Sequence, residues 1–72
     1  MRLDYFPETD SLYIDLAARP STDSHEVVDG VVLDYDAQGR LVGIDIDEAS
    51  TRVELGRLIL TNLPGTIETA AA

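Results

Sequence analysis

The chain has no cysteine, no lysine and a single histidine, and these absences narrow the chemistry that it can support. Without cysteine there is no disulfide and no thiol nucleophile, and with His25 as the only histidine a zinc site lacks its usual ligands. No serine lies in a Gly-x-Ser-x-Gly context, and the glycines are scattered as turn residues rather than gathered into a phosphate-binding loop. We therefore expect a protein that is not an enzyme and has no cofactor.

Long apolar runs and positive charges are also scarce. The sequence predicts no membrane span and no signal peptide, and hence a soluble cytoplasmic protein. Fourteen Asp and Glu residues against five Arg give a net charge of -9. Such a surface repels nucleic acids and anionic membranes, which bind proteins largely through Lys and Arg. A basic protein partner, a cation, or solubility alone remain as interpretations of the charge.

A chain of 72 residues forms one small domain with a thin core. We expect the domain to cover residues 1–72, with order over about 1–64 and a frayed tail at 65–72. Domains of this size usually need a disulfide, a metal or a partner subunit for stability. With the first two disfavoured, the sequence predicts a homodimer.

The N-terminal region predicts a β-hairpin. Leu3 and Tyr5, and then Leu12, Ile14 and Leu16, alternate with polar residues, as in strands with one buried face. Residues 7–10 are typical of a turn. If Phe6 faces Ser11, then Tyr5 pairs with Leu12, Leu3 with Ile14 and Arg2 with Asp15.

A second hairpin is predicted from residues 31–35 and 40–47, joined by a type I turn that Gly39 closes in the left-handed region. Pairing Asp36 with Arg40 places Asp34 opposite Val42 and Val32 opposite Ile44. Both faces of this hairpin would then be apolar, so both would need covering. The residues expected to form an interface with a second copy or another protein are Val31, Leu33, Tyr35, Leu41, Val42 and Ile44.

The remaining segments complete the predicted fold. A third strand begins at Glu26 and ends at the Asp29-Gly30 turn, and residues 48–53 could form one helical turn. Residues 53–63 fit either a helix or a strand, and we favour a strand over 58–63. The predicted class is α+β, predominantly β: a small antiparallel β-meander of five to six strands with one short helix.

One stretch resembles a calcium-binding loop. Asp34, Asp36 and Gln38 stand at positions one, three and five, Gly39 at six and Asp45 at twelve. Strands rather than helices flank this loop, and the alternation of side chains along them points the acids to different faces. A hairpin turn accounts for the same residues. The alternative interpretation is weak binding of Ca²⁺ or Mg²⁺ through Asp34 and Asp36.

Two stretches of the sequence also resemble a known family. The stretches LDYFPETDSLYIDL and EVVDGVVLDYDAQGRLVGIDIDEAS are similar to a small bacterial family, domain of unknown function 2283, over about residues 3–63. The chain differs at Phe6-Pro7, where an acidic pair is common, and at Ile59 and Thr61, where charged residues are usual. The resemblance implies a compact, sheet-rich domain, and the gene neighbourhood of some members implies an antitoxin-like role; it assigns no catalytic residue.

These observations lead to one main functional hypothesis and two alternatives. The main hypothesis is a non-enzymatic, acidic protein-interaction domain that self-associates and binds a basic protein. The first alternative is the weak divalent-cation site at Asp34 and Asp36. The second is an enzyme whose site would form between two copies from carboxylates such as Asp45 and Asp47.

Overall fold

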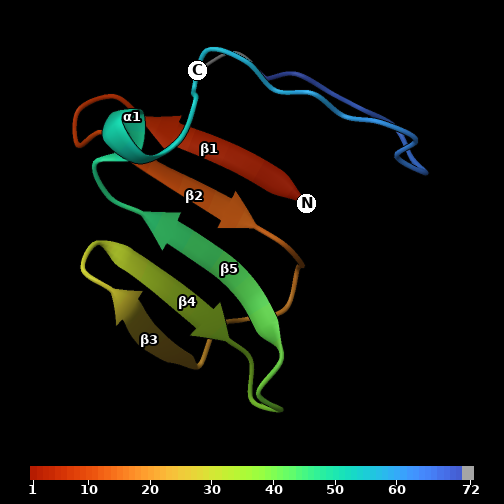
Figure 1. The fold of residues 1–72 in the computed structure, drawn as a ribbon. Helices are drawn as coiled ribbons and strands as arrows, with labels where there is room; N and C mark the ends of the chain where they lie inside the picture. Colours follow the sequence, from red (N-terminus) through yellow and green to blue (C-terminus); the bar gives the residue numbers. More distant parts are fainter. Residues whose placement is uncertain (71–72) are drawn as a thin grey trace.

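The computed structural model describes residues 1–70, which form one twisted antiparallel sheet and one short helix (Figure 1). The strands are β1 (Arg2–Phe6), β2 (Ser11–Asp15), β3 (Asp23–Val28), β4 (Val31–Tyr35) and β5 (Leu41–Ile46), and the helix is α1 (Ala49–Arg52). The predicted class, predominantly β with one short helix, is confirmed. The sixth strand is not formed.

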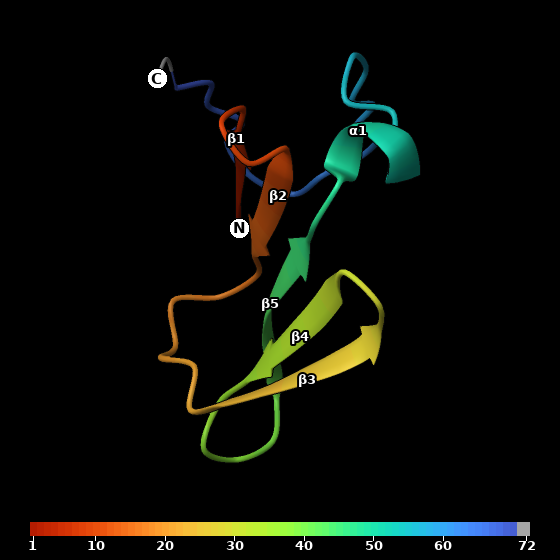
Figure 2. The ribbon, with the colours of Figure 1, turned by 90° about the vertical axis from the view of Figure 1, so that its left-hand side faces the viewer.

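The strands are not in sequence order across the sheet. The order is β1-β2-β5-β4-β3, so only β3, β4 and β5 form a meander, and the β1–β2 hairpin packs against β5. The linker of residues 16–22 carries the chain from β2, next to β5, to β3 at the far edge (Figure 2). The first hairpin has the predicted register, with Leu3 opposite Ile14 and Tyr5 opposite Leu12.

The register predicted for the second hairpin is wrong beyond its first pair. Tyr35 pairs with Leu41 as expected, but Asp34 then pairs with Gly43, because a β-bulge makes Val42 an extra residue. The bulge moves Ile44 and Ile46 to the same face as Leu33 and Val31. All four then share a face with Leu12 and Ile14 of β2, so the hairpin is apolar on one face rather than on both.

Strand β3 begins at Asp23, three residues earlier than predicted, and it is exposed along its whole length. The predicted turn at Asp29-Gly30 joins it to β4, with Gly30 at a φ of 85°. At the next turn Gly39 has a φ of 77°, a conformation that a residue with a Cβ rarely adopts.

Helix α1 is held to the β1–β2 turn by Asp10. The Asp10 carboxylate accepts hydrogen bonds from the Ser50 backbone N–H at 3.1 Å and from the Ser50 hydroxyl at 2.6 Å. The Ala49 N–H donates to the Asp10 carbonyl oxygen, and Ala49 is fully buried. The helical turn predicted over 48–53 is thus confirmed, and Asp10, on the β1–β2 turn, accepts the hydrogen bonds at its start.

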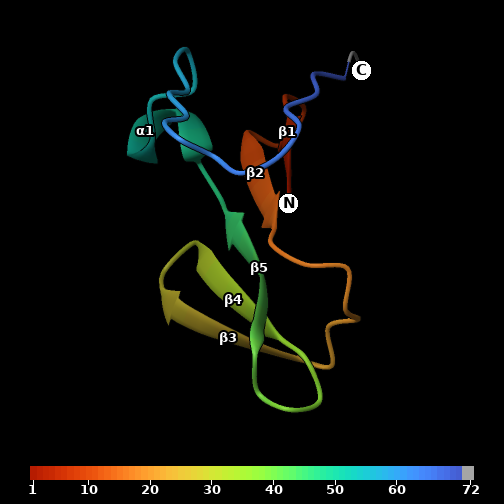
Figure 3. The same cartoon turned by 90° about the vertical axis from the view of Figure 1, so that its right-hand side faces the viewer.

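The C-terminal arm, residues 53–70, contains neither helix nor strand, so the strand favoured over 58–63 is wrong. Gly56 and Pro64 lie on either side of this segment, and the segment does not pair with the free edge of β1. The arm extends past β1 beyond the sheet (Figures 1 and 3). Residues 65–70 of the predicted frayed tail have no regular structure, and positions 71–72 lie outside the described residues. No helix in the described part of the chain is long and apolar enough to cross a membrane.

Candidate functional site

The sheet has two chemically different faces, which follow from its cross-strand pairing. One face consists of two rows of paired residues, each ordered from β1 to β3. We call it the apolar face, and its rows are Leu3–Ile14–Ile44–Leu33–His25 and Tyr5–Leu12–Ile46–Val31–Val28. His25 at the edge is its one ionisable side chain besides the Tyr5 phenol.

The opposite face carries most of the sheet's negative charge. We call it the acidic face, and its rows are Asp4–Tyr13–Asp45–Val32–Glu26 and Arg2–Asp15–Gly43–Asp34–Ser24. Half of these positions are carboxylates, and Arg2, at the edge, forms its ion pair with Asp4 rather than with the Asp15 expected from the register. The centre of this face therefore has no positive side chain of its own.

Tyr13 lies across the middle of the acidic face and links three strands. Its hydroxyl donates to Asp34 Oδ2 at 2.9 Å, and the Ser24 hydroxyl donates to Asp34 Oδ1 at 2.6 Å. Gly43 lies directly beneath the Tyr13 ring, where a Cβ would collide with the hydroxyl. The hydrogen bond to Asp34 raises the pKa of Tyr13 to about 12, so the phenol stays a neutral donor.

Among the carboxylates of this face, Asp45 is the one whose charged form is most clearly disfavoured by its surroundings. Burial raises its pKa, and the neighbouring charges of Asp47 and Asp34 raise it further. A cation close to Asp45 would stabilise its charged carboxylate. Apart from the Arg2–Asp4 ion pair at its edge, the acidic face thus has negative charges without cationic partners.

Asp36 has the opposite environment. Its carboxylate accepts hydrogen bonds from the backbone N–H groups of Gln38 and Arg40 at 2.9 Å, and it pairs with the guanidinium groups of Arg19 and Arg40 at 2.8 Å. Burial alone raises the pKa of Asp36, but the donors from Arg40 and Gln38 outweigh it and hold the pKa below its usual value. This cluster fastens the linker to the β4–β5 turn and occupies two of the five arginines.

The structure does not bring the predicted metal ligands together. Asp34 accepts from two hydroxyl groups on the acidic face, whereas the buried Asp36 is saturated by four donors at the turn. Within residues 1–70 no three His, Cys, Asp or Glu side chains are grouped as metal ligands. The cation site at Asp34 and Asp36 stays a prediction that this geometry does not favour.

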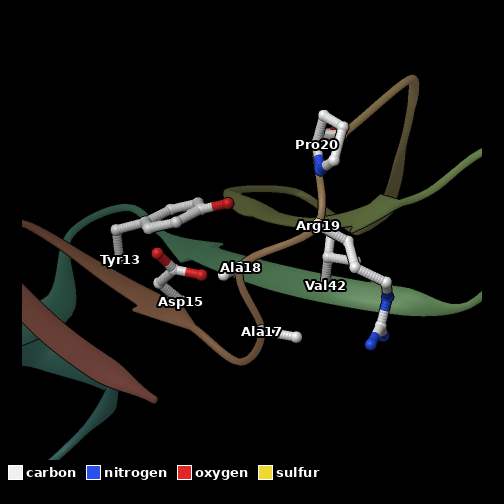
Figure 4. A pocket seen from close by; sticks show the side chains of 8 residues that line it. Tyr13, Asp15, Ala17, Ala18, Arg19, Pro20 and Val42 are labelled. Atoms are coloured by element: carbon white, nitrogen blue, oxygen red, sulfur yellow. The ribbon is translucent and has the colours of Figure 1, made fainter.

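A hollow of about 350 Å³ lies between the linker and the acidic face (Figure 4). Tyr13 and Asp15 form its polar side, and Val42 with the linker residues forms the rest. The Asp15 carboxylate points into this region, while the Arg19 side chain turns away toward Asp36 (Figure 4). Among the described residues no side chain forms an ion pair with Asp15, so the polar side of the hollow carries an unpaired negative charge.

The residues predicted for an interface are divided between environments. Val31, Leu33 and Ile44 share the apolar face, and Tyr35 pairs with Leu41 beyond the bulge. Val42 is only 2% exposed and lines the hollow instead, so it is not accessible from the apolar face. Whether the others contact a second protein stays a prediction.

Tyr13, Asp15 and Arg19 are site residues that could not be predicted from the sequence. Tyr13 and Asp15 were assigned only to the polar side of the first hairpin, since the alternation of residues 11–16 does not show which strand lies beside β2. The sequence of residues 17–20 does not indicate that the Arg19 side chain forms an ion pair with Asp36. Pairing between β2 and β5, which is distant in sequence, creates this region.

The fold and this surface define a small, predominantly β domain with one acidic and one apolar face. Residues 2–50 match the family described as protein of unknown function (DUF2283), and the chain belongs to that family. The matched residues include all five strands and the start of α1, whereas the arm lies beyond them. Searches of curated proteins and of solved structures gave no match.

Proposed function

We propose that the chain is a non-enzymatic interaction domain that binds a basic segment of another protein on its acidic face. The observation that supports this proposal most strongly is the absence of any positive side chain at the centre of a face with five carboxylates. The pKa of Asp45, which burial and then the charges of Asp47 and Asp34 raise, adds to it, because an approaching cation would stabilise the charged carboxylate.

The hollow beside Tyr13 suits an arginine or lysine side chain of such a partner. Asp15 supplies a charge for the head group, and Ala17, Ala18 and Pro20 of the linker can contact the methylene stem. A carboxylate binds a guanidinium or ammonium group through charge-assisted hydrogen bonds, which are stronger than those between neutral groups. An antitoxin-like role, in which the partner is a basic toxin, is the physiological form of this proposal.

The proposal is tested by measuring the affinity for an arginine-rich peptide by fluorescence anisotropy at two salt concentrations. We expect affinity to fall as salt rises, because exposed charge pairs are screened. We also expect Asp15→Asn combined with Asp45→Asn to weaken binding on the order of tenfold.

The matched control is Asp29→Asn combined with Glu54→Gln, which removes the same charge from positions outside the acidic face. Equal weakening by the two double variants would show an effect of net charge alone and would contradict the proposal. Self-association would use the opposite, apolar face, so it is independent of this binding activity.

A further inference from the structure

The apolar face is largely uncovered within one chain. Of its residues only Leu12 is buried, and Leu3 and Tyr5 are both 43% exposed. Side chains of this kind are stabilised by burial away from water. An uncharged sheet face of nine apolar residues in water therefore indicates an interaction surface.

The C-terminal arm carries a second set of uncovered apolar side chains. Leu58 is 66% exposed, Ile59 65% and Ile67 59%. The arm runs past β1 and does not lie on the apolar face of its own sheet (Figure 1). Its aliphatic content differs from that of disordered linkers, which are poor in such residues. The arm thus has apolar side chains that nothing in its own chain covers.

The exposed area has the size that a stable dimer buries. The chain exposes 5666 Å². A folded monomer of 7.8 kDa would expose about 4400 Å². The excess, about 1300 Å², exceeds the roughly 800 Å² that each partner buries in an interface of standard size.

The net charge restricts the surface on which a second copy can bind. Two chains with a net charge of -9 each repel one another, so only an uncharged surface can form a close contact between them. The apolar face meets this condition, and the acidic faces would then point outward into solvent.

The arm is long enough to reach the partner. Thirteen residues from Leu55 to Ile67, if extended, would span about 43 Å, and the longest dimension of the molecule is 31 Å. We propose that a second copy of this chain covers the apolar face, and that the arm of each copy packs on the other copy's sheet. This inference goes beyond the proposed function, because it concerns the opposite face and needs no basic partner.

Sedimentation equilibrium of the full chain tests the dimer, with twice 7.8 kDa as the expected mass. Leu58→Ser combined with Ile59→Ser in the arm, and separately Leu3→Ser on the apolar face, should each raise the dissociation constant on the order of tenfold or more. All three side chains are exposed in one chain, so these changes leave the monomer fold intact. Phe6→Ser is the matched control, because Phe6 is 48% exposed and lies outside the apolar face.

Isotope-filtered NMR on a mixture of labelled and unlabelled chains tests the exchange of arms. Contacts between the Leu58 and Ile44 methyl groups across the two chains are the expected result. A mass of 7.8 kDa at millimolar concentration, or a dimer as sensitive to Phe6→Ser as to the arm variants, would overturn the inference. Arm contacts found only within a chain would overturn the arm exchange.

Discussion

At the scale of single residues, the contact between Tyr13 and Gly43 shapes the acidic face. The phenol can cross β5 and reach Asp34 only because position 43 has no side chain. The contact could not be predicted from the sequence, since Gly43 reads as a weak position in a strand until β2 is known to be its neighbour. Gly43 thus contacts Tyr13, which lies on another strand and thirty positions earlier in the sequence.

Gly43→Ala should therefore lower the free energy of unfolding by about 1–3 kcal/mol, the usual cost of overpacking. Urea unfolding at a fixed protein concentration measures it, because association would contribute to the apparent stability. In the background of Tyr13→Leu, which removes the hydroxyl from above position 43, the same change should cost less. An equal cost in both backgrounds would show that the Tyr13 contact is not its cause.

At the scale of elements, the β4–β5 hairpin shows how far the sequence predicts the fold. Its turn, its strands and the Tyr35–Leu41 pair could be predicted from Gly39 and the alternating pattern. The bulge at Val42 could not, because its benefit appears only in the whole sheet. It brings Ile44 and Ile46 into register with the apolar residues of β2, and it leaves Val42 to be buried under the linker.

The Asp36 cluster joins this hairpin to the linker, so the stability of both depends on pH. The pKa of Asp36 is lowered in the folded state, so its stabilising effect is present above the ordinary carboxyl pKa, about 3.8, and is lost as the pH falls through its lower folded value. We expect Asp36→Asn to lower the Tm at pH 7 and to reduce the fall in Tm between pH 6 and pH 3. Circular dichroism melts at a fixed protein concentration measure both quantities.

Asp23→Asn, on the exposed strand β3, is the control for this prediction. It should leave the dependence of Tm on pH close to that of the unchanged chain. An Asp36→Asn chain whose Tm falls with acid as steeply as before would show that other carboxylates control the acid limb.

At the scale of the whole molecule, the sheet separates two kinds of surface. The five strands that form both faces lie within the residues that match the family. The arm lies beyond those residues and adds exposed apolar side chains. The alternation of residues in β1 and β2 predicted one apolar and one polar side. The concentration of carboxylates on the polar side follows from the strand order, which no local pattern of residues reveals.

The most direct test of the acidic face as a binding surface is an NMR titration of the full chain with the arginine-rich peptide, followed through its backbone amide signals. We expect the largest shifts at Tyr13, Asp15 and Asp45 and in the linker beside the hollow, with the apolar face unchanged. Shifts centred on Leu33 and Ile44, or small shifts spread evenly over the chain, would contradict binding at the acidic face.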